Sequence, residues 1–299
     1  MSFPLPSLKQ LHYLVALKDH GHFGRAAEAS FVTQPTLSNA IADLEALIGA
    51  RLVERTRRVV RFTPLGERIA EKARRILRDA EELAELARAS GKPLAGELSM
   101  AVIPTIAPFL LPRLLPRLRH DFPELKLYLR EETSQAGCDS LQRGQVDCVL
   151  LAFPFACGEV ESEILFDDAL FVAFPPAEAE GLPTIVTPRS IDENRLLLLE
   201  DGHCLKEHAL AACNRPELRA GASMLGTSLH TLVQMVDNGL GQTLVPEMAI
   251  RAGILEGTRV AARPLIAEHA CRRIALIWRK GSPRDKEFRL LSAELARGK

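Results

Sequence analysis

The sequence predicts an α/β protein that carries an all-α winged helix-turn-helix at its N-terminus and a long helix behind it. Three observations predict this fold class: short helical patterns followed by an arginine-rich hairpin, a proline-free stretch with heptad spacing, and apolar runs that alternate with helical patterns. The 299 residues suffice for two domains. We place the winged helix-turn-helix at residues 1–63, the linker helix at 64–92 and the α/β region at 93–299.

The formal net charge of the chain is zero, but the charge is unevenly distributed. Residues 1–92 hold 15 Lys and Arg against 11 Asp and Glu, and the remaining residues hold 23 against 27. Ten of the cationic side chains fall within residues 51–78. A basic segment joined to an acidic body is typical of a nucleic-acid or membrane module fused to another domain, with a solvated helix face as the alternative.

Two short helices are expected first. Ser7 and Gln10 form a capping-box pattern, and apolar residues at helical spacing follow until Gly21. A second helix fits Phe23–Ser30, where three alanines are small enough for close packing. A two-residue turn separates this helix from the next one.

The third helix is the candidate recognition helix. It opens with Pro35, which suits the first helical turn because its missing N–H would be unsatisfied there anyway, and it ends at Gly49. One face is apolar, and the other carries short polar side chains that can reach base edges in a major groove. The residues assigned to DNA contact from this segment are Thr33, Gln34, Pro35, Thr36, Ser38 and Asn39.

Two β-prone runs follow at residues 52–55 and 59–62, and they predict a hairpin. Its tip is cationic, so it has the right shape for a wing laid along phosphates, while the third helix reads sequence. The combination favours double-stranded DNA as a partner over a purely structural helical bundle. The side chains assigned to phosphate contact are Arg55, Arg57, Arg58 and Arg61.

A long helix is expected to begin at the cap Thr63 with Pro64 in its first turn and to stop at Gly91. Its length of about 27 residues corresponds to about 40 Å. A narrow apolar seam on such a helix favours a homodimer and hence an inverted-repeat DNA site, although the seam could instead pack on its own domain. The seam consists of Ile69, Ala73, Ile76, Ala80, Leu83 and Ala87.

The remaining residues alternate between strands and helices, which predicts a largely parallel sheet with helices on both faces. About 200 residues suffice for two small lobes with a ligand crevice at the carboxyl ends of the strands. The expected strands are Leu98–Ile103, Leu125–Leu129, Val146–Ala152, Leu170–Phe174, Leu196–Leu199 and Ile274–Trp278. The expected helices include Phe109–Asp121, Ser228–Asn238 and a C-terminal helix beyond Asp285.

A cytoplasmic location is expected. The best candidate for a membrane span, Leu98–Pro112, is interrupted by prolines and followed by Arg113, and the first ten residues lack a secretory pattern. Disulfides are rare in a reducing compartment, so the cysteines are expected to be thiols by default. No Cys-x-x-Cys pair occurs among them. The six are Cys138, Cys148, Cys157, Cys204, Cys213 and Cys271.

The segment from Glu200 to Cys213 carries the most specific chemistry. The turn Asp201-Gly202 is expected to cap a helix that holds Cys204 in its first turn, where backbone N–H groups and the helix dipole favour the thiolate. A thiolate reacts with peroxide to give a sulfenic acid, which a second thiol condenses to a disulfide. Cys213 is the nearest candidate in sequence.

Helix geometry makes this pair a candidate switch. Nine helical residues place Cys204 and Cys213 on opposite sides and about 13 Å apart along the axis, whereas a disulfide needs Cα atoms within about 7 Å. Oxidation would therefore remodel the segment. Two other interpretations remain: the cysteines are buried small hydrophobes, or a metal is held by His203, Cys204, His208 and Cys213.

The chain resembles the LysR-type transcriptional regulators over essentially its whole length. In the DNA-binding half the resemblance rests on Phe23–Ala27, Thr33–Ser38, Leu44-Glu45, Gly49, Arg55 and Thr63–Gly66. In the other half it rests on Leu141–Gly144, Val146-Asp147, Met235-Val236, Gly239, Gly241 and Leu244–Pro246. The resemblance implies a winged helix-turn-helix, a linker helix and a two-lobed domain like the periplasmic binding proteins. It also implies a homotetramer, and RNA polymerase is a further partner to consider.

Glu200–Cys204 with Cys213 resembles the peroxide-sensing members of that family. This similarity implies that Cys204 is the peroxidatic cysteine and Cys213 the resolving one, with no cofactor and no metal. It further implies lobes at about 93–167 with 270–299 and at about 168–269. The residues that it places around the peroxide are Ile103, Pro104, Thr105, Ser134, His203 and Arg273. Ser134 stands where the pattern usually has threonine.

Three functions are compatible with these patterns. The first is a transcription factor that responds to peroxide. The second is a LysR-type regulator whose cleft binds a small metabolite, the cysteines being incidental. The third is a thiol peroxidase, which leaves the helix-turn-helix unexplained.

Overall fold

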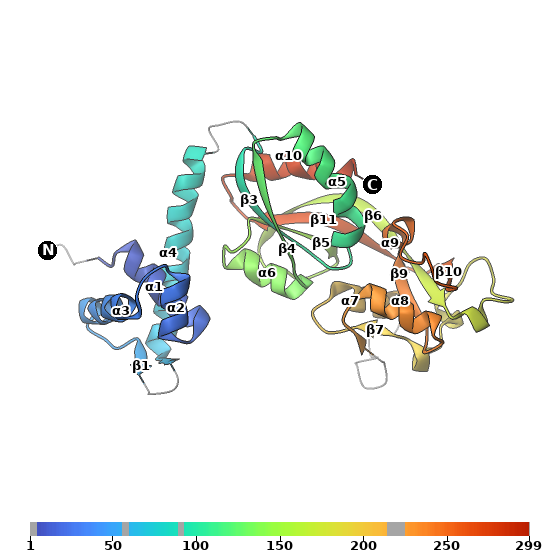
Figure 1. Cartoon of the computed structure of the whole chain (residues 1–299), viewed down its shortest axis with the longest axis horizontal. Helices are drawn as coiled ribbons and strands as arrows, with labels where there is room; N and C mark the ends of the chain where they lie inside the picture. The colour runs from blue at the N-terminus through green and yellow to red at the C-terminus, as the bar shows by residue number, and fades with distance from the viewer. Residues whose placement is uncertain (1–4, 56–59, 89–92, 214–224, 299) are drawn as a thin grey trace. The chain divides into compact units, whose positions relative to one another are not determined.

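The computed structural model describes residues 5–55, 60–88, 93–213 and 225–298. The chain divides into two compact units, Met1–Ser90 and Gly91–Lys299 (Figure 1). Within the described residues, no helix is both long enough and apolar enough to cross a membrane.

The N-terminal unit contains the predicted helix-turn-helix. Its helices are α1 (Leu8–His20), α2 (Phe23–Ala29) and α3 (Gln34–Ile48). Ser7 and Gln10 form the expected capping box, and α3 ends at Gly49 in the left-handed conformation that glycine adopts readily. The apolar faces of the three helices form one core, which includes Leu14, Leu17, Leu37, Ile41 and Leu44.

The predicted wing is present as an antiparallel pair, β1 (Val53–Arg55) and β2 (Val60–Phe62). Glu45 of α3 holds the start of this hairpin, because its Oε1 accepts hydrogen bonds from the amides of Leu52 and Val53 at 2.7 and 3.0 Å. Gly66 lies against the same segment, where a Cβ would come within 2.0 Å of the Leu52 carbonyl oxygen.

The linker helix α4 (Pro64–Arg88) begins at Thr63, whose Oγ1 accepts a hydrogen bond from the Gly66 amide at 2.9 Å. Its heptad seam has two different environments. Ala73, near the start of the seam, is buried within its own unit, where α4 packs on α1. Farther along, 46% of Ile76 and 70% of Leu83 remain exposed. The own-domain alternative therefore holds for the first part of the seam only.

The second unit is built on a sheet of seven strands in the order β10-β6-β11-β5-β3-β4, with β9 also paired to β6. The expectation of a largely parallel sheet is wrong. Only β3 pairs in parallel, with β4 and β5, whereas β11, β10 and β9 all run antiparallel to their neighbours. The strands are β3 (Gly96–Val102), β4 (Leu125–Glu131), β5 (Cys148–Phe153), β6 (Val160–Phe174), β9 (Thr243–Pro246), β10 (Ala261–Pro264) and β11 (Cys271–Arg279).

A separate parallel pair, β7 (Leu198–Leu199) with β8 (Leu225–Gly226), precedes and follows the candidate cysteine segment. In Figure 1, α5 and α10 lie on one side of the β3-β4-β5-β11 part of the sheet and α6 on the other. The helices of this unit are α5 (Ala107–Asp121), α6 (Ser134–Gln142), α7 (Cys204–Ala212), α8 (Leu229–Asp237), α9 (Glu247–Arg251) and α10 (Asp285–Ala296).

Two hydrophobic clusters make this unit two-lobed. One lies around β3, β5, α5, α6 and α10, and the other around β7, β9, α7 and α8. The long strand β6 serves both clusters: Phe166 packs against the first and Leu170 belongs to the second.

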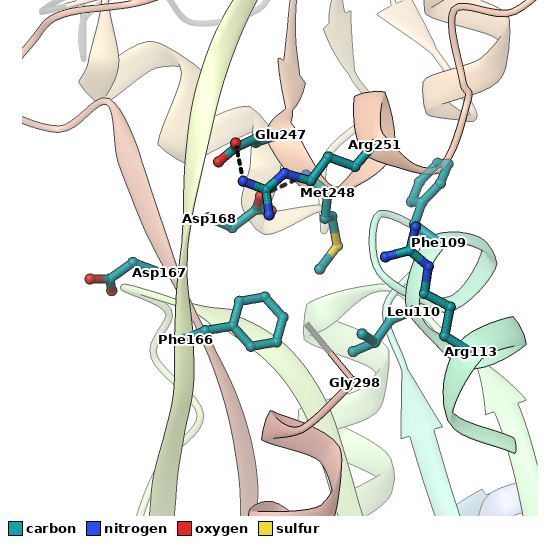
Figure 2. A pocket seen from close by; sticks show the side chains of 10 residues that line it. All are labelled: Phe109, Leu110, Arg113, Phe166, Asp167, Asp168, Glu247, Met248, Arg251 and Gly298. Atoms are coloured by element: carbon teal, nitrogen blue, oxygen red, sulfur yellow. Dashed lines mark hydrogen bonds and ion pairs between the residues drawn. The ribbon is translucent and has the colours of Figure 1, made fainter. Parts of the chain in front are cut away.

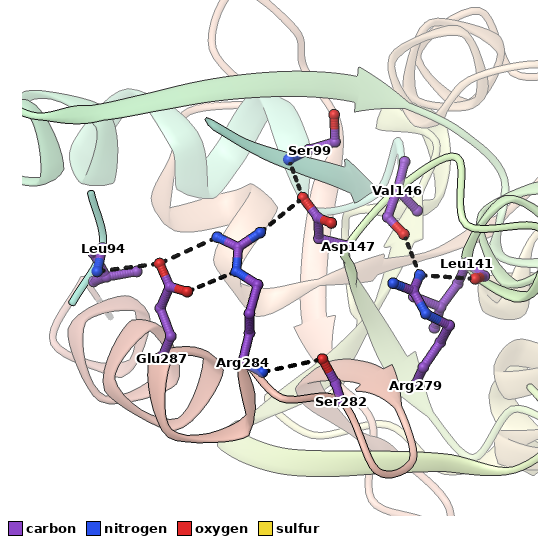
Figure 3. Close-up of polar contacts among 9 residues, drawn as sticks. All are labelled: Leu94, Ser99, Leu141, Val146, Asp147, Arg279, Ser282, Arg284 and Glu287. Carbon is purple, nitrogen blue, oxygen red and sulfur yellow. Dashed lines mark hydrogen bonds and ion pairs between the residues drawn. The ribbon is translucent and has the colours of Figure 1, made fainter. Parts of the chain in front are cut away.

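A polar network fixes the first lobe where its distant segments meet (Figure 3). Arg284 bridges Glu287 of α10 at 2.6 Å and Asp147, just before β5, at 3.3 Å. Asp147 in turn accepts a hydrogen bond from the Ser99 amide of β3 at 2.7 Å. Nearby, Arg279 of β11 donates to the carbonyl of Leu141 at 3.2 Å and so holds the C-terminal end of α6.

Candidate functional site

Cys204 is the first residue of α7 and only 1% of it is exposed. The predicted turn is present at Asp201-Gly202, and Gly202 has a φ of 92°, which favours glycine. The N-cap itself is His203, not the turn, and its side chain makes no capping hydrogen bond. Cys204 thus lies at the N-terminus of a helix as expected, but inside the first hydrophobic cluster.

The start of α6 lies against the start of α7. The Cys204 amide donates to Ser134 Oγ at 3.3 Å, and the Gln135 amide donates to the Gly202 carbonyl at 3.3 Å. Of the residues assigned to the peroxide site, Ser134 therefore contacts Cys204 directly, and His203 precedes it in the chain. Thr105 is buried and is hydrogen-bonded to Arg272.

The arginine that acts on Cys204 is Arg272, and the assignment of Arg273 is corrected accordingly. Arg272 is completely buried and its charge acts on the Cys204 thiol, whereas Arg273 is exposed. The cause is the alternation of side chains along β11, because neighbouring residues of a strand point to opposite faces of the sheet. The register places Arg272 inside.

Arg272 ties the two lobes together at the site. Its NH1 donates to Thr105 Oγ1 at 2.8 Å and its NH2 to the Thr105 carbonyl at 3.0 Å, while Nε donates to Asp168 Oδ2 at 3.0 Å. The other oxygen of Asp168 accepts a hydrogen bond from the Met248 amide of α9 at 2.9 Å. The buried charge is therefore paired and hydrogen-bonded, as a buried ion requires.

Burial dominates the electrostatics of the cysteine. Burial raises the pKa of Cys204 above its ordinary value of 9.0, although Arg272, the Ser134 hydroxyl and the Ala152 amide all act to lower it. The expected thiolate is thus not the resting form, because the low dielectric around the sulfur disfavours the charge more than the helix N-terminus favours it. Burial likewise lowers the pKa of His203, whose imidazole is neutral at pH 7.

Cys213 lies at the other end of the same helix, as the C-cap of α7. It is a buried thiol that belongs to the second hydrophobic cluster, whereas Cys204 belongs to the first. The intact helix of nine residues holds the two Cα atoms about 13 Å apart along the axis, beyond the reach of about 7 Å that a disulfide allows.

His208 lies one turn after Cys204 in α7 and faces the loop that follows β5. Its Nε2 is 2.9 Å from the Pro154 carbonyl oxygen. Burial lowers the pKa of His208 to about 4, more than the Pro154 carbonyl raises it, so the imidazole is neutral and donates through Nε2.

The metal interpretation gains no support: over the described residues, no group of three or more His, Cys, Asp or Glu side chains could hold an ion.

Two other cysteines are not thiols, contrary to the default expectation. Cys138 of α6 and Cys157, in the loop between β5 and β6, form a disulfide with Cα atoms 5.3 Å apart. Nineteen residues separate them in sequence, so only the packing of α6 against this loop brings them together. Cys148 and Cys271 are thiols, as expected.

Cavities among the described residues of this unit differ in size. One, lined by Phe153, Pro154, Phe155, Ala156, Glu207 and Arg273, has a volume of about 550 Å³ and is open to solvent. Another lies beside Asp168 and Met248 and has a volume of about 30 Å³, which holds a water molecule or two but no organic ligand (Figure 2).

The helix α3 displays the residues assigned to DNA. Thr33 caps the helix and its hydroxyl is 2.8 Å from that of Thr36. Both threonines are exposed, as are Gln34, Pro35 and Asn39, and Ser38 is half-buried. Arg55 ends β1, and Arg61 is exposed on β2. Arg57 and Arg58 lie outside the described residues.

Three residues of these sites are not among those that the sequence patterns predict. Asp168, the partner of Arg272, lies 104 residues from it in the chain. Glu45 holds the wing through amides only seven and eight residues away, but a glutamate on a helix carries no pattern that distinguishes this role. The position of Arg272 had a signal, since neighbouring residues of a strand point to opposite faces and exposure alternates over residues 271–274.

Comparisons with known proteins agree with this architecture. Residues 8–67 match the bacterial regulatory helix-turn-helix protein, lysR family, and residues 91–298 match the LysR substrate binding domain. The chain is 41% identical over 287 residues to the HTH-type transcriptional regulator EstR of Acinetobacter baylyi, covering 95% of this chain and 94% of that protein. It is 37% identical over 292 residues to the DNA-binding transcriptional dual regulator OxyR of Escherichia coli, covering 96% and 93%.

Among solved structures, a full-length OxyR variant from Pseudomonas aeruginosa superimposes with a TM-score of 0.77 at 32% identity, covering 98% of this chain and 95% of that one. The sequence motifs, the winged helix-turn-helix and the two-lobed α/β unit all lead to the same assignment. This chain belongs to the LysR family of transcriptional regulators and is similar to its OxyR-type, hydrogen peroxide-inducible members.

Proposed function

We propose that this protein is a peroxide-sensing, DNA-binding regulator switched by oxidation of Cys204 to a sulfenic acid and then to a Cys204–Cys213 disulfide. The observation that carries the proposal is the placement of two thiols at opposite ends of α7, in different hydrophobic clusters. A covalent bond between them demands a new backbone, which is what a switch needs. The similarity to OxyR of Escherichia coli supports the same function.

The chemistry balances with peroxide as the only oxidant. The Cys204 thiol loses its proton, and the sulfur attacks one peroxide oxygen; the O–O bond breaks and water leaves, which gives the sulfenic acid. The Cys213 sulfur then attacks the Cys204 sulfur, and the second water departs as the disulfide forms. Two thiols are oxidised and one peroxide is reduced to two waters.

The residues around Cys204 support the first step. The Arg272 charge stabilises the thiolate as it forms, which offsets part of the cost of burial. The hydroxyls of Ser134 and Thr105 orient the peroxide, and His203, which is neutral, accepts or donates a hydrogen bond without adding charge. Arg272 takes the role assigned to Arg273 on sequence grounds.

The second step reorganises the lobes. For the two sulfurs to meet, α7 unwinds, and at least one cysteine leaves the cluster in which it is buried.

The exposed part of the α4 seam supports a homodimer, and we extend this to a homotetramer that binds an inverted-repeat DNA site. The protein acts in the cytoplasm, with RNA polymerase as a partner in activation. Remodelling of the second unit, Gly91–Lys299, then changes the spacing between the N-terminal units of the assembled protomers.

The test combines oxidation mapping with DNA binding by the full chain. After stoichiometric hydrogen peroxide, mass spectrometry of alkylated peptides is expected to show a Cys204–Cys213 disulfide in the wild type. Cys213→Ser should stop at the sulfenic acid, and Cys204→Ser should show neither product. Cys271→Ser, which alters an exposed thiol, is the matched control and should behave as wild type.

DNA affinity is measured on the same samples by fluorescence anisotropy with an inverted-repeat duplex. Oxidation should change the affinity or footprint of the wild type and of Cys271→Ser, and leave Cys204→Ser unchanged. If Cys204→Ser responds to peroxide as the wild type does, the proposal is wrong.

A second candidate function is regulation by a small metabolite. The open cavity of about 550 Å³ supports it, because Arg273 and Glu207 offer charged groups beside the aromatic wall formed by Phe153 and Phe155. The match of residues 91–298 to the LysR substrate binding domain also supports it. Thermal stabilisation by an organic acid, together with DNA affinity that is insensitive to oxidation, would favour this candidate.

A further inference from the structure

The disulfide between Cys138 and Cys157 lies apart from the proposed switch, yet both of its segments contact α7. We propose that this disulfide is a second redox site, a latch that holds α7 in its reduced, helical arrangement until a dithiol reductant opens it. The inference rests on the proposed function in one respect only, namely that α7 is the element that rearranges.

The first segment is α6. Its first residue, Ser134, accepts the Cys204 amide hydrogen bond at 3.3 Å, and Cys138 lies one helical turn later on the same helix. The far end of α6 is held by Arg279, which donates to the Leu141 carbonyl. Ser134 is therefore carried on a rigid element, and the N-terminal end of α7 is tied to it.

The second segment is the loop between β5 and β6. Pro154 in this loop accepts the hydrogen bond from His208 at 2.9 Å, one turn after Cys204 in α7. Cys157, three residues later, is bonded to Cys138, and its carbonyl accepts a hydrogen bond from Gln142 Nε2 of α6 at 3.1 Å. The middle of α7 is thus tied to the loop, and the loop is tied to α6.

These contacts close a ring. It runs from Cys204 to Ser134, along α6 to the disulfide, through the loop to Pro154, and by His208 back into α7. With the disulfide formed, both partners of α7 move as one body, so the helix must break both hydrogen bonds together in order to unwind. With it reduced, the loop can follow His208 while Ser134 stays with α6.

The opening reaction is thiol–disulfide exchange. One thiolate of the dithiol attacks the Cys138–Cys157 bond and releases one cysteine as a thiolate, and the second thiolate of the reductant then displaces the other cysteine. The products are two protonated cysteines and the cyclic disulfide of the reductant, so two electrons and two protons move to the protein. Peroxide closes the latch again, with release of two waters.

A staple without regulatory effect is the competing role, because a disulfide that closes a loop of this length stabilises the fold in any case. The two roles differ in where the protein loosens. A latch affects α7 selectively, whereas loss of a staple lowers the global stability and loosens all buried segments together.

The experiment measures thiol labelling in the full chain without peroxide. Rates of alkylation at Cys204, Cys213 and Cys148 are followed by mass spectrometry in the wild type and in the double variant Cys138→Ala/Cys157→Ala. Cys148 is completely buried in β5, in the same hydrophobic cluster as Cys138 and Cys157 but outside α7, and serves as the internal control. Wild type treated with dithiothreitol forms a third sample.

The double variant should label Cys204 and Cys213 about fivefold faster, the factor that corresponds to one hydrogen bond of ordinary net strength, with Cys148 unchanged. Dithiothreitol should reduce the Cys138–Cys157 bond in the native wild type and produce the same increase. Equal acceleration at Cys148, no acceleration at all, or a disulfide that resists dithiothreitol in the folded protein would each overturn the latch.

Failure of the proposed function leaves a different signature. If Cys204 does not react with peroxide, the labelling comparison still reports on α7, because it uses no peroxide. If the proposed function holds, the double variant should also form the Cys204–Cys213 disulfide about fivefold faster than the wild type after equal doses of peroxide.

Discussion

Burial decides what each charged or reactive side chain of the sensing unit can do. Cys204 has a raised pKa and His208 a lowered one for the same reason, since the surrounding low dielectric disfavours the charged form of either group. Arg272 keeps its charge in the same surroundings because Asp168 and Thr105 satisfy it. Cys204 thus rests as a neutral thiol on which a fixed positive charge acts.

Replacing Arg272 should be far more damaging than replacing its neighbour. Arg272→Met leaves the buried Asp168 carboxylate without its ion pair, and removing one partner of such a pair costs about 3–5 kcal/mol of unfolding free energy. Arg273→Met alters an exposed side chain and should change it by less than about 0.5 kcal/mol. Urea denaturation measures both, and equal losses would contradict the assignment of Arg272 as the buried residue.

Acid should destabilise the protein through His208. Its pKa is about 4 in the folded protein and 6.5 without burial, so the unfolded chain binds the proton more readily. The contribution of the neutral imidazole to the unfolding free energy is fully present above pH 6.5 and is lost as the pH falls toward 4. The total loss is about 3 kcal/mol.

The carboxylates of the protein titrate in the same pH window, so the measurement is a difference. His208→Gln keeps an N–H donor for Pro154 but has no proton to gain. Its unfolding free energy should fall less steeply between pH 6.5 and 4 than that of the wild type. Parallel pH profiles for the two proteins would show that His208 does not contribute.

At the level of secondary-structure elements, single side chains join segments whose local patterns are independent. Glu45 connects α3 to the hairpin by accepting two backbone hydrogen bonds, and Asp168 connects β6 with β11 and α9. The Cys138–Cys157 disulfide connects α6 with the loop after β5. Each such link fixes the position of an element that carries a functional residue.

Glu45→Ala should loosen the wing while α3 remains helical. Two amides, those of Leu52 and Val53, lose their charged acceptor, and hydrogen bonds to charged groups are each worth about 1.5–3 kcal/mol. Hydrogen exchange within residues 8–67 should show faster exchange at these two amides. Asp43→Ala, an exposed change on the same helix, is the control and should leave them protected.

At the scale of the whole molecule, the neutral total charge conceals a basic N-terminal unit and an acidic second unit. In the proposed function, phosphate contacts by the basic unit supply affinity that weakens with salt, whereas base contacts from α3 supply specificity. The acidic unit adds no attraction for DNA. The proposed assembly uses α4, whose apolar seam is only partly buried within its own unit.

Charged substitutions in the exposed part of that seam should prevent dimerisation. Ile76→Asp combined with Leu83→Asp places charges at two apolar positions that are open to solvent in the single chain. Sedimentation velocity at micromolar concentration should show a monomer for this variant and a dimer or larger assembly for the wild type. Glu71→Lys, which lies off the seam, is the control and should sediment as wild type. If the double variant still sediments as a dimer, the seam is not the dimer interface.

Much of the DNA-binding unit could be predicted from the sequence because its signals are local. The capping box at Ser7, the proline that opens α3 and the glycine that ends it act within one or two helical turns. The same holds for Thr63 at the start of α4. Each depends only on backbone groups a few residues away, so the pattern and the structure coincide.

The sensing unit was harder to predict because long-range packing decides it. The apolar runs located most strands, but alternation of strands and helices could not reveal that β11 inserts antiparallel between β5 and β6 from the far end of the chain. Nor did the cysteine count reveal that Cys138 and Cys157 are paired, since nothing local links them.

By itself the sequence determined the order of the elements, the family and the cysteine pair on α7, since spacing along a helix follows from the chain alone. Only the tertiary structure decided that Arg272 is buried with its charge acting on Cys204, that Asp168 pairs with it, and that burial raises the pKa of the thiol. Those properties depend on the direction of each side chain and on the dielectric that surrounds it. Both arise only when segments more than a hundred residues apart pack together.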